Sequence, residues 1–125
     1  MLREAGRGYD GRAMNHLALA APDVAASAAF YQRYFGFEPM GPAGMLRGPT
    51  GFVLSIDEVP APVVVPSWFH HGFVVGSPAE LEALHARLAA DGVTIVDPPR
   101  AQGPTMVFFC RDPAGLLVEV RAPAA

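Results

Sequence analysis

Three ionisable side chains, His16, His70 and Glu119, each stand in a short segment that is otherwise apolar. A carboxylate left dry and unpaired in such a setting costs several kcal/mol, and a bound divalent metal would remove that penalty. Two imidazoles and one carboxylate on one side of a site leave coordination positions open, as in non-haem Fe(II) centres. The residue types therefore indicate a candidate metal site.

All three segments read as β-strands, in which residues two apart share a face. One face of each strand is bulky and apolar, so we expect it to pack under helices. The other face carries small residues and one ionisable group. Taken singly, each histidine also fits a hydrogen-bonded core or edge residue, and Glu119 fits a solvent-facing carboxylate on an edge strand. The three segments are residues 15–21, 68–75 and 116–121.

The order of elements repeats along the chain, with a strand, a helix and three strands in each half. Asp23 is a good N-cap for a first helix, and Ser77 and Glu80 form a capping box at the start of a second. Residues 98–104 read as a loop because they hold three prolines and a glycine. The pattern predicts an α+β fold of two βαβββ modules. We expect one domain over residues 14–125, with modules at about 14–57 and 67–122, a proline-rich linker up to residue 66, and an N-terminal tail or arm over residues 1–13.

The two halves can be laid on one another, and His16 then falls on His70. Ser55 falls on Glu119, each four residues after a turn glycine. Equivalent positions of a repeat should converge, so we expect these side chains to share one site. Ser55 is a weak ligand, and its place in that site would be to hold a metal-bound water.

Composition excludes several function classes. The chain of 125 residues has no lysine, which removes Schiff-base catalysis and the phosphate-loop lysine. Its one cysteine allows no internal disulfide and no cysteine zinc cage. A net charge of −3 without a basic cluster argues against nucleic acid, and no apolar run is long enough to span a membrane. The N-terminus lacks an apolar signal core, so we expect a cytosolic protein.

The chain resembles the vicinal oxygen chelate superfamily, which includes glyoxalase I, bleomycin-resistance proteins and extradiol dioxygenases. The resemblance covers about residues 14–122 and implies two modules whose sheets form an open, eight-stranded, barrel-like cleft with the helices packed outside. By position it implies metal ligands at His16, Ser55, His70 and Glu119. The implied cofactor is a divalent iron, manganese, zinc or nickel ion. The segments that carry the resemblance are NHLALAAPD, AAFYQRYFGFE, FHHGFVV, SPAELEALHARLAADGV and FFCRDPAGLLVEV.

Besides a domain that has lost activity and mediates protein contacts, two functions from different classes remain open. The first is a metal-dependent enzyme, with His16, His70 and Glu119 as ligands and Glu119 counted as catalytic. It would act on a small substrate with vicinal oxygens, by lyase, isomerase or dioxygenase chemistry. The second is a binding protein that sequesters a drug or metabolite without turnover, as bleomycin-resistance proteins do. In both cases we expect a homodimer, because exposed strand edges need covering.

Other side chains give weaker signals. Trp68 shares a face with His70 and is equally suited to line a substrate pocket or to fill the core. Arg121 shares a face with Glu119 and is placed either to hold an anionic substrate or to end a solvated strand. His71 faces the opposite way from His70, under the helix, although a one-residue shift in register would exchange the two. Cys110 fits a small core residue better than a nucleophile.

Overall fold

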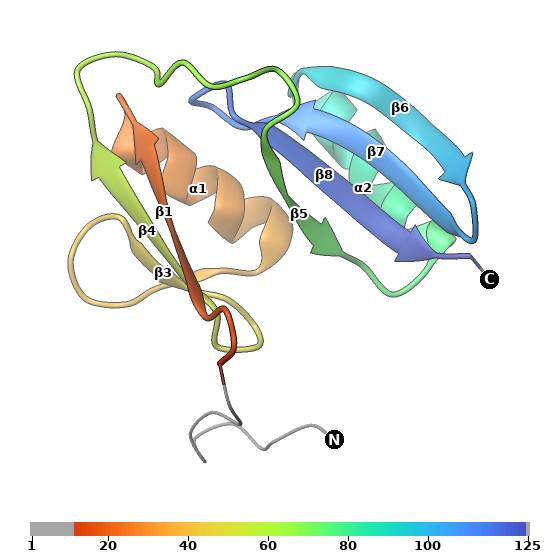
Figure 1. The fold of residues 1–125 in the computed structure, drawn as a ribbon, viewed down its shortest axis with the longest axis horizontal. Coiled ribbons are helices and arrows are strands. Elements are labelled where there is room, and N and C mark those ends of the chain that lie inside the picture. The colour runs from red at the N-terminus through yellow and green to blue at the C-terminus, as the bar shows by residue number, and fades with distance from the viewer. Residues whose placement is uncertain (1–11, 125) are drawn as a thin grey trace. The chain divides into compact units, whose positions relative to one another are not determined.

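The computed structural model describes residues 12–124, which divide into two compact modules at residues 61 and 62 (Figure 1). Each module contains one helix and one four-stranded sheet in the order strand, helix, three strands. The predicted α+β fold of two βαβββ modules is therefore confirmed. The predicted arm over residues 1–13 lies almost entirely outside the described residues. The joining of the two sheets into one eight-stranded cleft stays a prediction.

The N-terminal module pairs its first strand with its last. Its elements are β1 (His16–Ala21), α1 (Val24–Phe35), β2 (Glu38–Pro39), β3 (Met45–Arg47) and β4 (Val53–Glu58). The strand order is β1-β4-β3-β2, with β1 parallel to β4. Asp23 caps α1 by accepting a hydrogen bond from the backbone of Ala26, and Gly36 ends the helix in the left-handed region at φ 71°.

The C-terminal module repeats this topology with longer outer strands. Its elements are β5 (His70–Val74), α2 (Pro78–Ala90), β6 (Ile95–Gln102), β7 (Thr105–Arg111) and β8 (Leu117–Pro123), in the strand order β5-β8-β7-β6. The Ser77 half of the predicted capping box at α2 is confirmed, and the return bond from Glu80 reaches one residue further back than the N-cap. Ser77 accepts from the backbone N–H of Glu80, and the carboxylate of Glu80 accepts from that of Gly76.

The strand registers confirm the internal repeat. His16 lies opposite Val53 in the first parallel pair, and His70 lies opposite Leu117 in the second. Ser55 and Glu119 each lie two residues beyond that partner, so both lie on the same face as the histidine of their module. The superposition of the halves made from sequence is therefore the one that the backbone adopts.

Each sheet buries one face under its own helix and leaves the other face uncovered by that helix. In the N-terminal module Leu54 and Ile56 are buried, whereas Ser55 between them is half-buried. In the C-terminal module Val118 and Val120 are fully buried, whereas Glu119 between them keeps some exposure. The largest fully buried side chains are Tyr31, Leu46 and Leu54 in the first module and Phe108, Leu81 and Leu88 in the second.

Three expectations about element boundaries differ from the structure. Residues 98–104, expected as a loop, continue strand β6 to Gln102, and only Gly103 and Pro104 form the turn to β7. Strand β6 lies at the edge of its sheet and shifts register between Asp97 and Arg100, so its two central prolines break no inner ladder. The strand expected from residue 68 begins at His70, because residues 67 and 68 form a turn.

The linker also starts later than expected, since β4 runs on to Glu58 beside β1. Within residues 12–124 no helix combines the length and apolar character that crossing a membrane would require.

Candidate metal site in the C-terminal module

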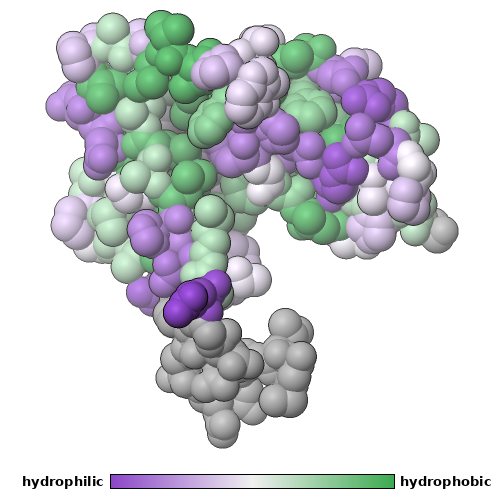
Figure 2. Space-filling view, in the orientation of Figure 1, coloured by the Kyte–Doolittle hydropathy of each residue, from purple (hydrophilic) through white to green (hydrophobic). Residues whose placement is uncertain are grey.

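The uncovered face of the C-terminal sheet carries a chain of polar side chains. Figure 2 shows hydrophilic residues gathered over this face, in the same orientation as Figure 1. His70 Nε2 lies 3.4 Å from Glu119 Oε1, and Arg121 Nε donates to Glu119 Oε2 over 3.0 Å. The structure therefore brings together three of the predicted site residues, two as candidate ligands and one as their neighbour.

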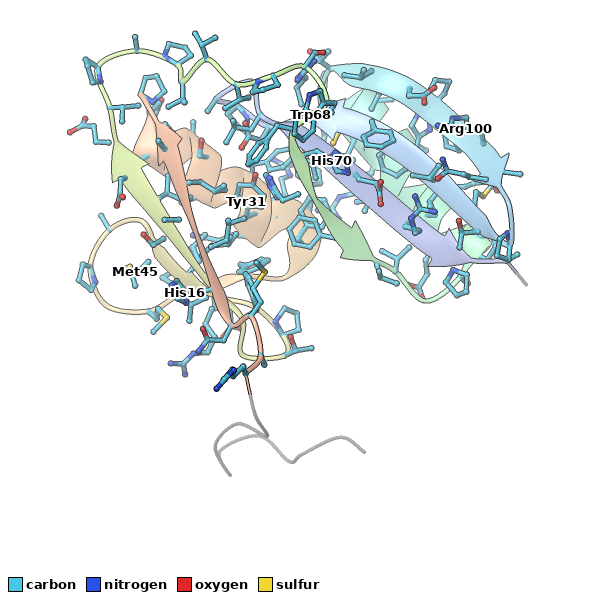
Figure 3. The ribbon with its side chains drawn as sticks, viewed as in Figure 1. His16, Tyr31, Met45, Trp68, His70 and Arg100 are labelled. Atoms are coloured by element: carbon cyan, nitrogen blue, oxygen red, sulfur yellow. The ribbon has the colours of Figure 1, made fainter. Side chains whose placement is uncertain are left out.

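The ring of His70 is held by the turn that precedes β5. Its Nδ1 donates to the carbonyl oxygen of Trp68 over 2.8 Å, and the two residues lie together at the start of that strand (Figure 3). A carbonyl oxygen can only accept, so Nδ1 carries the proton. In the neutral imidazole Nε2 then presents a lone pair, which points toward Glu119. Such a bond from the second ring nitrogen is usual in metal-ligating histidines.

With the His70 ring neutral, this geometry leaves two acceptors facing one another. A carboxylate oxygen and an unprotonated imidazole nitrogen repel at close range unless a proton or a metal cation lies with them. Two ligands bound at about 2.0–2.2 Å to one ion at a roughly tetrahedral angle are about 3.4 Å apart. The Nε2 to Oε1 distance of 3.4 Å matches that span. His70 and Glu119 therefore fit a divalent metal in donor chemistry and in spacing.

Arg121 is bound on several sides by protein acceptors. Besides Glu119, its guanidinium donates to Thr105 Oγ1 and to Gln102 Oε1. Gln102 and Thr105 flank the β6–β7 turn. Sequence reasoning missed Gln102 because residues 98–104 were read as a loop, and it missed Thr105, the first residue of a predicted strand, because the pairing with Gln102 was not recognised. Reading the chain as strand up to Gln102 would have placed both on the face of Glu119, since residues paired across antiparallel strands share a face.

Gly72 makes room for the carboxylate. It pairs directly with Glu119 across β5 and β8. A Cβ at this position would lie 3.1 Å from the backbone oxygen of Glu119 and 3.2 Å from its Cβ. These distances are tighter than ordinary contacts, so a larger residue here would push against the strand that carries Glu119.

The N-terminal module places His16 and Ser55 in equivalent positions. His16 Nδ1 donates to Asn15 Oδ1 over 2.8 Å, which again leaves Nε2 available as a ligand. Ala18 lies opposite Ser55, as Gly72 lies opposite Glu119. His16 and Ser55 belong to a different module from His70 and Glu119, so their convergence on one metal stays a prediction. Within each module taken alone, the described residues hold no cluster of three His, Cys, Asp or Glu side chains suited to a metal.

The remaining candidates fall outside this polar chain. His71 is half-buried on the helix side of β5, as predicted, and burial lowers its pKa, with Asp112 opposing and His70 adding to that shift. Cys110 is fully buried, in agreement with a core role. Trp68 has 71% of its surface exposed and so does not fill the core of its module. Its role as a pocket wall stays a prediction.

Comparison with known families agrees with this architecture. The model of the Glyoxalase/Bleomycin resistance protein/Dioxygenase superfamily matches residues 13–120. The chain belongs to this superfamily. The membership confirms the resemblance drawn from sequence, and it covers both candidate ligand pairs. No curated protein sequence gives a significant match.

Solved structures of the superfamily share the fold. A possible glyoxalase from Bacillus cereus is 31% identical, with a TM-score of 0.76 over 86% of this chain and 96% of its own. A fosfomycin resistance protein from Listeria monocytogenes is 23% identical, with a TM-score of 0.73 over 92% and 94%. A glyoxalase/dioxygenase from Nostoc punctiforme is 19% identical, with a TM-score of 0.74 over 98% and 97%. The last two likenesses show the fold alone.

Proposed function

We propose that this superfamily member is a metal-dependent enzyme acting on a small substrate with vicinal oxygens, by lyase, isomerase or dioxygenase chemistry. His70, Glu119 and His16 are the proposed ligands of a divalent iron, manganese, zinc or nickel ion. The observation that carries the proposal is the 3.4 Å separation of Nε2 of His70 from Oε1 of Glu119, which matches the span between two ligands of one ion. A bound ion would supply Lewis acidity toward the oxygens of the substrate.

The chain's own residues orient the site in this proposal. The carbonyl of Trp68 sets the tautomer and the plane of the His70 ring, and Asn15 does the same for His16. Glu119 contributes negative charge on a strand whose other ionisable side chain is Arg121. Ser55, at the repeat position of Glu119, contributes a neutral hydroxyl, so the two modules together would supply one anionic ligand.

Metal binding by purified protein tests the proposal. After chelator treatment, the protein is titrated with Mn²⁺, Fe²⁺, Zn²⁺ and Ni²⁺, and bound metal is measured by mass spectrometry and calorimetry. We expect about one ion per chain in wild type, and loss of most of the affinity in Glu119→Gln and His70→Gln. His85→Gln is the matched control, because His85 packs edge-on against Phe108 of the helix-side core. A wild-type protein that takes up none of these ions after reconstitution would refute the proposal.

The contribution of His16 needs its own variant. His16→Gln should weaken metal binding as strongly as His70→Gln if both modules supply ligands to one ion. Unchanged affinity in His16→Gln would restrict the site to the C-terminal module. The wild-type titration thus shows whether metal binds, and the His16→Gln variant shows which module supplies the ligands.

A non-catalytic binding role is the second candidate, and one observation favours it. Trp68 and Phe69 are 71% and 53% exposed, with ring centroids 6.1 Å apart, immediately before His70. Exposed aromatic pairs of this kind offer stacking area to an apolar ligand. Stabilisation of the protein by such ligands in the presence of chelator, without turnover, would favour this role. The homodimer and the cytosolic location also stay predictions, and light scattering tests the first.

A further inference from the structure

We infer that Arg121 is a positioning residue that fixes the carboxylate of Glu119, and that the β6–β7 turn holds Arg121 through Gln102 and Thr105. The inference rests on the proposed metal function and deepens it. It assigns to Arg121 a role toward the protein's own ligand in place of contact with an anionic substrate. It also gives Gln102 of β6 and Thr105 of β7 a role in the site, as residues that hold Arg121.

The hydrogen bonds of the guanidinium carry the first step. Nε of Arg121 donates to Oε2 of Glu119 over 3.0 Å, and its NH2 nitrogen donates to Oε1 over 3.4 Å. The shorter bond, from Nε, holds Oε2, so the carboxylate cannot rotate freely about the Cγ–Cδ bond of Glu119. Oε1 is the oxygen left toward Nε2 of His70. Because arginine presents a rigid planar fork, one residue can fix both the place and the plane of a carboxylate.

Both terminal nitrogens of Arg121 also donate to protein acceptors. NH2 donates to Oε1 of Gln102 over 2.6 Å, and NH1 donates to the hydroxyl of Thr105. That hydroxyl donates its own hydrogen to the carbonyl of Gln102 over 2.8 Å, so its lone pairs are available to the guanidinium. Protein acceptors therefore engage all three nitrogens of the guanidinium, which leaves little capacity for a substrate anion.

The turn that holds Arg121 is itself fastened to the sheet. Thr105 pairs with Pro123 of β8, and the backbone N–H of Ala124 donates to the carbonyl of Pro104 over 2.8 Å. Gln102 and Thr105 pair with one another across the turn. The acceptors of Arg121 are thus placed by backbone pairing and not by mobile side chains alone. The side chain of Arg121 is 30% exposed and that of Glu119 is 18% exposed, so the pair is partly shielded from water.

Metal affinity is the first test. Partners of ligating side chains typically contribute 10- to 100-fold in affinity. We therefore expect R121M to bind Mn²⁺ about 10- to 100-fold more weakly than wild type, measured by electron paramagnetic resonance of free Mn²⁺. R121K, which keeps the charge without the fork, should recover only part of the loss. R100M is the matched control on the same face, because Arg100 is bonded to Asp97. Mn²⁺ affinity of R121M equal to or above that of wild type would overturn the inference.

Two gentler variants guard against misfolding. T105V and Q102L each remove one acceptor of Arg121 and keep Glu119 and Arg121 intact. Both should weaken Mn²⁺ binding in the same direction as R121M but by less. Affinities equal to wild type in both variants would remove the turn from the proposal.

A crystal structure of metal-free R121M supplies a readout that does not depend on metal. In metal-free wild type a proton takes the place of the ion between the two groups, so we expect Oε1 of Glu119 to stay within about 4 Å of Nε2 of His70, the range of an ion-pair contact. In R121M the carboxylate should lie elsewhere or occupy several rotamers. An unmoved carboxylate contradicts the positioning role, even if metal affinity falls. If wild type binds no metal and the carboxylate moves in R121M, the proposed function fails and the positioning role stands.

Discussion

The two modules share one backbone plan and differ in what they carry at matching positions. Glu119 and Arg121 of the second module correspond to Ser55 and Asp57 of the first by register. The charged pair of the second module is held by the β6–β7 turn, whereas strands β2 and β3 of the first module are only two and three residues long. A half-buried carboxylate therefore stands where neighbouring strands are long enough to bring it partners.

The residue across the strand follows the same logic. Gly72 lies opposite the large Glu119, and Ala18 lies opposite the small Ser55. The larger of the two ligand-position side chains thus faces the residue without a side chain, and the smaller one faces a methyl group. The difference teaches that a ligand position within a repeat depends on its cross-strand neighbour as well as on its own identity.

Alkylation of the thiol should give the largest effect. Burial, together with the charge of Asp112, raises the pKa of Cys110 to about 12. At pH 8 the native thiolate fraction is then about 10³-fold below that of an unfolded cysteine. Iodoacetamide should label the native protein slower than the denatured protein by at least that factor, followed by mass spectrometry. The first module has Leu46 at the matching position, so Leu46→Cys in a Cys110→Ala background gives the comparison there.

The same shift fixes the sign of an alkaline effect. An unfolded thiol ionises near pH 8.5 while the buried one stays protonated, so the unfolded state binds fewer protons above that pH. The contribution of Cys110 to stability should therefore fall as the pH rises from about 8.5 toward 12, and Cys110→Ala should remove that fall. Urea unfolding at pH 8 and pH 10 measures it. An identical pH dependence in both proteins would show that the thiol is not protected.

Truncation in the two cores should destabilise the modules alike. Leu54 on β4 and Leu88 on α2 are 1% and 0% exposed, one in the core of each module. Leu54→Ala and Leu88→Ala should each cost about 2–5 kcal/mol in the free energy of unfolding, through lost burial and a residual cavity. Urea unfolding with far-ultraviolet circular dichroism measures both. A loss below about 1 kcal/mol at one site would show that this module relaxes around the cavity and that the two cores are not equivalent.

Exchanging the small residues tests the cross-strand rule. Gly72→Ala forces a methyl group against the backbone of Glu119, so we expect a loss of about 1–3 kcal/mol. Ala18→Gly is the matched change in the first module and should cost about 0.5–1 kcal/mol through backbone entropy. Chemical unfolding gives both values. Equal losses would mean that the volume opposite Glu119 is not restricted.

The helix caps should give the smallest effects. Asp23→Ala and Ser77→Ala should each cost about 1 kcal/mol, since each cap accepts a backbone N–H of the first turn. The first turn of α2 keeps Glu80, and that of α1 has no acidic residue. We therefore expect the larger loss at Asp23, read from melting temperatures at low salt. A larger loss at Ser77 would contradict this account of the helix ends.

The fold was predictable because local signals and the repeat agreed. Asp23, Ser77 and Gly36 mark helix ends by chemistry that acts within a few residues, and alternation gave the correct faces for His16, His70 and Glu119. These inferences need no knowledge of distant contacts. The register of the parallel pairs then confirmed the superposition of the halves.

The partners of Glu119 were not predictable in the same way. The prolines of β6 indicated a loop because a residue without a backbone N–H cannot complete the ladder of an inner strand. An edge strand tolerates them, but the sequence does not show that β6 is an edge. Gln102 was lost with that strand, and Thr105, which starts the next predicted strand, was left without the cross-strand pairing that shows its role. The role of Arg121 also depends on them, because only the paired turn brings their acceptors to its guanidinium. Hydrogen bonds from Arg121 to residues 16 and 19 positions earlier in the sequence form this part of the site.

The parallel pairing of first and last strands has a consequence for how such a chain can change over time. A substitution at Ser55 or Asp57 alters the chemistry of the uncovered face and leaves every ladder bond intact. The insertion or deletion of one residue within β4 or β8 would instead turn the downstream ionisable groups into the helix-side core. Descendants of this chain can therefore diversify readily by point changes on these strands, while length variation is confined to the connections between them.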